Sequence, residues 1–271
     1  MIRLSSIELI ERHHVLETGT RPLLVHCSDF NYYICKYNRT KTIAYKLATE
    51  YLAASFLKLW DLYIPPFNLI QIQNRHLNAE TGIGIIKIDQ PCFGSMRLKD
   101  AAEVSEYYNE ISAAQSRKFA DKTEFLTIAF FDIWISNDDR NINNYNMLIV
   151  NENDGQHFVP IDHGDCFHTV NHHLQNYPIT EIDSILSSSI LSKLYKASEL
   201  RNEGFLAALI DRWYFCSESC KANLEDLIQE IPDEWLIPKE KYYEEINTYL
   251  FSEKWFETCI QTFREYIQLL E

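Results

Sequence analysis

The most informative segment of the chain reads Leu126-Thr-Ile-Ala-Phe-Phe-Asp-Ile-Trp-Ile135, followed at once by Ser136-Asn-Asp-Asp-Arg-Asn-Ile-Asn-Asn-Tyr-Asn146. The first half is apolar almost all round, which is typical of a helix buried at the centre of a lobe. The second half is polar at ten of its eleven positions. We therefore expect a buried helix over 121–136 that ends in a loop rich in carboxylates and carboxamides. Such a loop, held between two apolar elements, favours a binding or catalytic role.

A hairpin is predicted directly after this loop. The runs 147–150 and 157–161 flank Asp154-Gly155, and Asp-Gly is a strong turn signal. The second strand leads into Asp162-His163-Gly164, so a second acid is held at the end of a strand. Two acid-bearing loops then face the same end of one hairpin.

The first ninety residues predict short strands around one helix. Strands are expected at 22–26, 32–36, 67–72 and 84–88, and the apolar stripe over about 42–60 has helical spacing. These elements make a small antiparallel sheet with one main helix packed on it.

The rest of the chain predicts helices. We expect a helix over 97–113, helical structure from about 180 onward, and a helix entry at Ile231-Pro-Asp-Glu-Trp-Leu236. Together with the length of 271 residues, this predicts an α+β fold of two lobes. The expected division is a sheet lobe over 1–92 and a mostly helical lobe over 93–271 that carries the hairpin.

Oxygen-rich loops of this kind suit Mg²⁺, which is bound by one or two carboxylates together with substrate phosphates and water. The sheet lobe contributes Lys36 on a strand, Glu50 at the edge of the helical stripe, and a turn around Gly19 that offers backbone donors. With Asp139 and Asp162, these are the working parts of phosphoryl transfer. The cofactors expected are ATP and Mg²⁺.

The composition narrows the range of partners. Lys and Arg total 25 against 39 Asp and Glu, a net charge of -14, which disfavours direct nucleic-acid binding and an anionic membrane surface. Seven scattered cysteines in a chain of this size favour free thiols in a reducing compartment. No secretory signal or run of 18 apolar residues is present, so we expect a cytoplasmic protein.

Several segments spread over nearly the whole chain occur in the order typical of one family. They are Leu16–Val25, Tyr33–Lys36, Leu47–Ala54, Phe93–Ser95, Phe131–Arg140 with Asn144–Leu148, Ile161–Gly164 and Ile231–Leu236. As a set they resemble the HipA-like kinases, in particular the short single-chain members. The resemblance implies a protein-kinase-like fold of two lobes.

The same resemblance implies roles for single residues. Lys36 is similar to the lysine that binds the α- and β-phosphates, and Glu50 to its ion-pair partner. Asp139 matches the catalytic aspartate that accepts the substrate hydroxyl proton. Asp162 matches the metal-binding aspartate, here in Asp-His-Gly.

Two asparagines are candidates for the remaining metal ligand. Asn144 lies five residues after Asp139, the spacing of the family's catalytic-loop asparagine, whereas Asn146 immediately precedes the strand. The short members often carry this Asn-x-Asn pair, so both remain open.

The phosphate-binding turn implied by the resemblance contains Thr18, Gly19 and Thr20. It has a single glycine where protein kinases carry Gly-x-Gly-x-x-Gly. In the family a hydroxyl of this loop can be autophosphorylated, which makes Thr18 and Thr20 candidates. A further departure is Asn141, which stands where a histidine usually follows Asp-Arg.

Three functions agree with these residues. The first is a kinase that transfers the γ-phosphoryl group of ATP to a hydroxyl, most readily Ser or Thr of a protein substrate. The second is a phosphoinositide or small-molecule kinase, and the third is a nucleotide-binding pseudokinase that acts through a protein partner. The family resemblance also implies a toxin-like role with a small antitoxin-type partner, beside that of a stand-alone kinase.

Other polar residues have structural interpretations. We expect Asp132 to pair with a basic group such as Arg140, and Asn137 and Asp138 to brace the loop. The histidines at 163, 168, 172 and 173 lack further ligands at metal-binding spacing. Cys216 and Cys220 share a helix face, which favours core packing.

Overall fold

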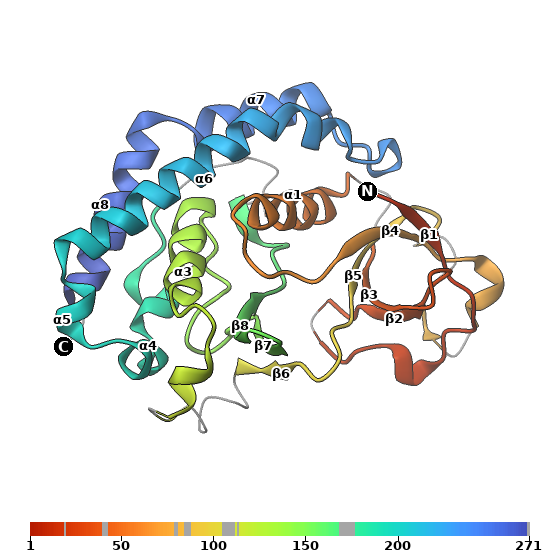
Figure 1. The fold of residues 1–271 in the computed structure, drawn as a ribbon. Helices are drawn as coiled ribbons and strands as arrows, with labels where there is room; N and C mark the ends of the chain where they lie inside the picture. The colour runs from red at the N-terminus through yellow and green to blue at the C-terminus, as the bar shows by residue number, and fades with distance from the viewer. Residues whose placement is uncertain are drawn as a thin grey trace.

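The computed structural model describes residues 1–18, 20–39, 43–78, 81–83, 88–104, 112, 114–167 and 177–269. In this part of the chain a curled sheet and a group of helices form two lobes that lie side by side (Figure 1). The predicted α+β class and its two-lobed arrangement are confirmed.

The sheet lobe contains five strands. In spatial order they are β1 (Arg3–Ser5), β4 (Phe67–Gln71), β5 (Cys92–Met96), β3 (Tyr32–Lys36) and β2 (Leu23–His26). β1 runs parallel to β4, and the other neighbours are antiparallel. The two edge strands are joined where the Ile7 N–H donates to the His26 carbonyl at 3.0 Å and the Ser28 N–H donates to the Ser5 carbonyl at 2.9 Å. The sheet therefore curls into a barrel, which protects its edges from pairing with another chain.

The hairpin of β2 and β3 and the strand β4 lie where the sequence predicts them. The strand expected at 84–88 falls outside the described residues except for Ile88, and the central strand is β5 instead. Gly94 in β5 fits because a Cβ there would lie 2.3 Å from Ile70 Cγ1. The sheet thus continues to Met96, while the division into 1–92 and 93–271 stays a prediction.

The predicted helix of the first lobe is α1 (Tyr45–Leu59). It lies between the sheet and the helices of the second lobe (Figure 1). Ten of its fifteen residues are buried. The apolar ones among them belong to the same hydrophobic cluster as the core of the helical lobe. A helix with so little exposed surface needs partners on opposite sides, and α1 finds one in each lobe.

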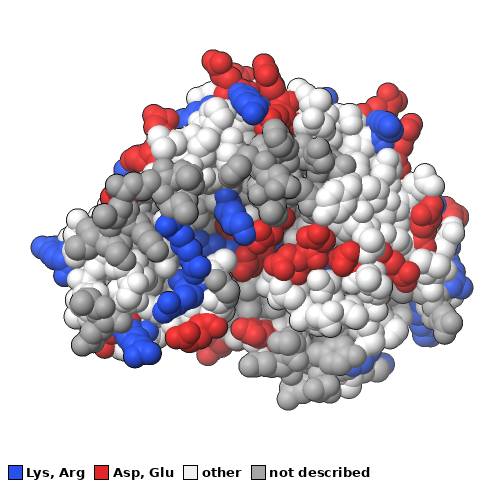
Figure 2. Space-filling model, turned by 180° about the vertical axis from the view of Figure 1, so that it is seen from behind, with Lys and Arg blue, Asp and Glu red and all other residues white. Residues whose placement is uncertain are grey.

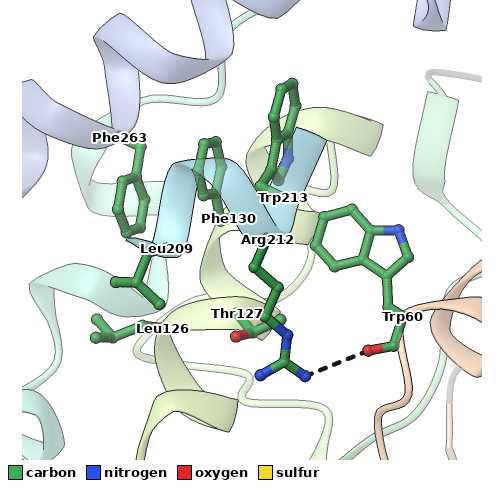
Figure 3. Close-up of a pocket in the computed structure, with 8 residues that line it drawn as sticks. All are labelled: Trp60, Leu126, Thr127, Phe130, Leu209, Arg212, Trp213 and Phe263. Carbon is green, nitrogen blue, oxygen red and sulfur yellow. Dashed lines mark hydrogen bonds between the residues drawn. The ribbon is translucent and has the colours of Figure 1, made fainter. Parts of the chain in front are cut away.

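The helical lobe is built around α3. Its helices are α3 (Thr123–Ile135), α4 (Ser189–Leu194), α5 (Ala197–Leu200), α6 (Glu203–Gln229), α7 (Lys239–Leu250) and α8 (Glu253–Leu269). Every residue of α3 after Thr123 is buried, which confirms the predicted central helix. Between α3, α6 and α8 the aromatic packing leaves a cavity of only about 10 Å³, lined by Trp60, Trp213 and their neighbours (Figure 3).

Helical structure from residue 180 onward is confirmed. In the described residues, no helix is both long and apolar enough to cross a bilayer.

A second, small sheet carries the loops of the site. Its order is β6 (Ala102–Glu103), β7 (Met147–Glu152) and β8 (Gly155–Pro160), and it contains the predicted hairpin. The helix expected over 97–113 is wrong at its start, because Ala102 and Glu103 pair with β7. Pairing with β7 overrides the local periodicity there, and most of 105–113 lies outside the described residues.

The helix entry expected at 231–236 is also different in the structure. Residues Asp233–Trp235 form a short 3-10 turn, and α7 begins only at Lys239. The reason is Leu236, whose φ of 58° is left-handed and ends the turn.

Candidate active site

A cavity of about 360 Å³ lies between the two lobes. The segment before β2, the sheet and α1 contribute apolar wall residues, which include Leu16, Ile34, Leu57 and Phe93, and Leu148 of β7 also lines the cavity. One end of the cavity is polar, with Lys36, Glu50, Asn146, Asp162 and His163. The cavity therefore combines a surface suited to a flat apolar group with a cluster of charges.

Lys36 joins three segments at the polar end. It is the last residue of β3, and its Nζ donates to Glu50 Oε2 of α1 at 2.7 Å and to Asp162 Oδ1, two residues beyond β8, at 2.6 Å. The predicted convergence of the lysine, the helical acid and the strand-end acid is thus present in the structure.

The charge of this lysine is stabilised by its partners. Burial alone would lower the pKa of Lys36, but the carboxylates of Glu50 and Asp162 outweigh burial and raise it. The side chain is 17% exposed and the Glu50 side chain only 6%. The ammonium group is therefore held protonated and oriented in a largely desolvated position.

Glu50 also fixes the segment that follows β8. Its Oε2 accepts the backbone N–H of His163 at 3.0 Å. A Cβ at Gly164 would lie 3.3 Å from the same oxygen, so glycine leaves room for this contact. Asp162 itself has a φ of 58°, an unfavourable left-handed conformation for a non-glycine residue, which the surrounding contacts hold.

Asp139 is oriented by the two candidate asparagines. Asn146 Nδ2 donates to Asp139 Oδ2 at 2.8 Å, and Asn144 Nδ2 donates to Asp139 Oδ1 at 3.2 Å. Asn146 lines the cavity with Asp162, whereas neither Asn144 nor Asp139 is among its lining residues. The loop that follows α3 thus places Asp139 one hydrogen bond away from the polar end of the cavity.

Arg140 is buried beneath the site and connects its loops. Its guanidinium donates to Asp132 of α3, to the Asn146 carbonyl at 3.3 Å, to the Ile161 carbonyl at 2.8 Å and to His163 Nε2 at 2.8 Å. The predicted pairing with Asp132 is confirmed. Burial, which outweighs the nearby arginine, raises the pKa of Asp132 to about 6.

The residues predicted for the phosphate-binding turn do not all lie at the cavity. Thr18 lines the cavity, Thr20 is exposed and does not, and Gly19 lies outside the described residues.

The remaining interpretations are structural. Asn137 Nδ2 bonds Asp132 Oδ1 at 2.8 Å, so it braces the loop as predicted. Cys216 and Cys220 are buried in α6 as core residues, and all seven cysteines are buried and unpaired. The histidines at 168, 172 and 173 lie outside the described residues.

Two features of the site were not predicted from the sequence. Arg140 was expected only as the partner of Asp132, yet it also joins the loop that follows α3 to the segment around Asp162. The residues of the cavity walls were not predicted either. The wall also includes the end of β5 and the residue after it, namely Ser95, Met96 and Arg97. A usable signal was Gly94, one of only seven glycines, which marks a close approach of backbone to side chain.

The curled sheet, the helical lobe and the lysine that bridges two acids between them define a two-lobed kinase. Residues 7–263 match the family of HipA-like kinases, and the chain belongs to this family. Among solved structures, the Helicobacter pylori proinflammatory kinase CtkA is similar, with a TM-score of 0.54, 12% identity and 99% of each chain covered. At that identity the likeness concerns the fold, and it confirms the predicted kinase-like arrangement. No curated protein matches the chain.

Proposed function

We propose that the protein uses ATP and Mg²⁺ to transfer the γ-phosphoryl group to a hydroxyl, most readily that of Ser or Thr in a protein. The observation that carries this proposal is the position of Lys36 Nζ, 2.7 Å from Glu50 and 2.6 Å from Asp162. Three segments from two lobes meet there at one end of a single cavity. A positioned cation beside a metal-binding acid is what phosphoryl transfer requires.

The cavity suits a nucleotide in size and in the distribution of its polar groups. Its 360 Å³ lies within the range of about 300–1,000 Å³ typical of small-molecule sites. The apolar walls would receive the adenine ring, and Lys36 would bind the phosphates as a fixed positive charge. Glu50 keeps the lysine oriented when the nucleotide is absent.

The donor set fits Mg²⁺ when phosphates complete it. Among the described residues, no three His, Cys, Asp or Glu side chains are arranged to hold a metal by themselves. Asp162 offers a carboxylate that is 37% exposed, and the Asn146 nitrogen is directed to Asp139, which leaves the amide oxygen for a cation. Oxygen donors from one or two side chains plus phosphates and water are usual for this ion. When bound, Mg²⁺ neutralises phosphate charge during transfer.

Asp139 would accept the proton of the attacking hydroxyl. Two amide donors hold its carboxylate, one on each oxygen. This arrangement aligns the acceptor before the substrate binds, and such positioning contributes most of the catalysis in phosphoryl transfer. We assign metal binding to Asn146 and the orientation of Asp139 to Asn144.

The surface favours a protein substrate over an anionic lipid. On the face seen in Figure 2, acidic side chains form a band across the middle, with a smaller group of basic side chains beside it. Lipid kinases need a cationic surface against the membrane, and the net charge of -14 opposes this. A small antitoxin-type partner and autophosphorylation at Thr18 remain proposals from the family, and Thr18 is the better candidate because it lines the cavity.

The proposal is tested by incubating the protein with γ-labelled ATP, Mg²⁺ and cell lysate. We expect labelled phosphoserine or phosphothreonine with the wild type and a loss of at least about 100-fold in Asp162→Asn. The matched control is Asp165→Asn, an equal change three residues on at an acid of similar exposure that pairs with Lys46.

Label in extracted lipids or small molecules would support the second kinase class instead. Nucleotide binding without any transfer above the Asp162→Asn background would support the pseudokinase and refute the proposal.

A further inference from the structure

Besides the chain that leads out of β5 and the contacts of Lys36 and α1, the described residues between α6 and α7 also connect the two lobes. The turn between α6 and α7 reaches across the molecule to the start of α1 and to the sheet beside β1 (Figure 1). We name residues 230–236 the bridging turn. They lie between two helices of the helical lobe in sequence, yet Glu230, Glu234 and Trp235 contact the sheet lobe and α1.

Trp235 is the centre of the bridging turn. Its side chain is fully buried, and its indole Nε1–H donates to the Pro91 carbonyl at 2.7 Å, immediately before β5. Its own carbonyl accepts the backbone N–H of Ala44 at 3.0 Å, at the start of α1. Ala44 offers no side-chain cap to the helix, so a backbone group of the bridging turn takes part in holding this helix end, where N–H groups otherwise lack partners.

Two further contacts attach the same turn. Tyr51 of α1, the residue after Glu50, donates its hydroxyl to Glu230 Oε2 at 3.1 Å. Arg3 of β1 donates to Glu234 Oε1 at 2.8 Å. Leu236, which follows Trp235, is held at a φ of 58°, a conformation that leucine adopts only when its surroundings enforce it.

We propose that the bridging turn, through Trp235, positions α1 so that Glu50 stays within hydrogen-bond distance of Lys36 and the nucleotide site is preformed. Glu50 follows Ala44 by six residues, about 9 Å along a helix, so a shift of the helix start is transmitted to the carboxylate. Trp235 is a positioning residue because it acts on the site through α1. The part of this inference that concerns nucleotide rests on the proposed function.

The test compares Trp235→Phe with Trp213→Phe. The first variant keeps an aromatic ring and loses the N–H that binds Pro91. The second makes the same change at another buried tryptophan, seen in Figure 3, whose Nε1 has no hydrogen-bond partner among the described residues. Two readouts are needed: the dissociation constant for Mg-ATP and amide hydrogen exchange in α1, both well below each variant's unfolding midpoint.

For Trp235→Phe we expect a dissociation constant about three- to tenfold higher and faster exchange in α1, because one interlobe hydrogen bond no longer favours the binding-competent position. Tyr51→Phe should also raise the dissociation constant for Mg-ATP and the rate of exchange in α1, but by less. Trp213→Phe should leave both at the wild-type value.

Equal behaviour of Trp235→Phe and Trp213→Phe in α1 exchange would overturn the inference, whether both resemble the wild type or both exchange faster. If the wild type binds no nucleotide, the proposed function fails. The exchange comparison still decides on the bridging turn, so the two failures are distinguishable.

Discussion

The inside of the sheet lobe and the core of the helical lobe are separate hydrophobic clusters of unequal extent. The sheet interior is small and includes Val25, Cys35 and Ile70. The helical core is much larger and contains the buried faces of α1, α3, α6, α7 and α8. All five tryptophans of the protein lie in the larger cluster.

This difference shows how the site is divided. Lys36 extends from β3 next to Cys35 of the sheet interior, whereas Glu50 extends from α1, which packs with the helical core. The ion pair of Lys36 and Glu50 therefore crosses from one cluster to the other. Nucleotide binding reports on both clusters together, while tryptophan fluorescence reports on the helical core.

The largest effects should come from truncating one cluster at a time. Ile133→Ala in α3 and Ile70→Ala in β4 both remove a fully buried isoleucine side chain, and each should cost about 2–5 kcal/mol. In urea titrations, Ile133→Ala should lower the midpoints of tryptophan fluorescence and of nucleotide binding alike. Ile70→Ala should lower the midpoint of nucleotide binding more than that of fluorescence. If Ile70→Ala shifts both probes equally, the two clusters unfold as one unit and the comparison fails.

An intermediate effect is expected within the loop of residues 136–146, the proposed catalytic loop, which follows α3 of the helical lobe. Asn146→Ala should reduce turnover roughly 100-fold and raise the Mg²⁺ concentration needed for half-maximal activity, because it removes the metal ligand that we propose together with a hydrogen bond to Asp139 Oδ2. Asn144→Ala removes the hydrogen bonds to Asp139 Oδ1 and to the Asp139 carbonyl but not the proposed metal ligand, so it should reduce turnover about tenfold at an unchanged Mg²⁺ requirement. A Mg²⁺ titration of both variants decides the assignment, and the reverse order would exchange the roles of the two asparagines.

The smallest effect should be a pH dependence of the free energy of unfolding, caused by His157 in the hairpin of β7 and β8. His157 bonds Glu124 through Nδ1 at 2.6 Å and Asp154 through Nε2 at 3.0 Å. Burial alone would lower the pKa of His157, but these two carboxylates outweigh burial and raise it.

A histidine with a raised pKa contributes stability below its unfolded pKa of about 6.5, and this contribution is lost as pH rises through the folded pKa. The free energy of unfolding should therefore fall from pH 6.5 upward in the wild type. The decrease should be smaller in His157→Gln and unchanged in His13→Gln, which alters an exposed histidine. An equal pH profile for His157→Gln and the wild type would show that these bonds do not contribute.

Much of the fold could be read from short-range patterns. The hairpin of β2 and β3, the helix α1, the central helix α3 and the hairpin of β7 and β8 each have a local period or turn signal that their surroundings do not contradict. The helix predicted over 97–113 is wrong at its start because Ala102 and Glu103 pair with β7, some fifty residues away in the chain. Local periodicity contains no information about such a partner.

Part of the site could be predicted from the same local sequence patterns. Lys36 and Asp162 stand at or just after the ends of predicted strands and Glu50 lies in a predicted helix, so their places in the fold followed from those elements. Asp139 lies in the loop after α3 and outside the cavity lining, which the sequence did not indicate. Whether Asn144 or Asn146 faces the cavity was not readable, because it depends on the turn that connects them to β7.

The amino-acid sequence alone determined the α+β class, the two lobes and which charged residues stand at the ends of strands, because these depend on hydrophobic period and on chain order. Only the tertiary structure decided that α1 packs into the helical core, that Arg140 joins three segments beneath the cavity, and that Trp235 bonds both Pro91 and Ala44. Each of these is a contact between residues far apart in the chain or a set of bonds around one buried group. Such contacts are selected by close packing and by the need to pair buried polar groups, which no single segment specifies.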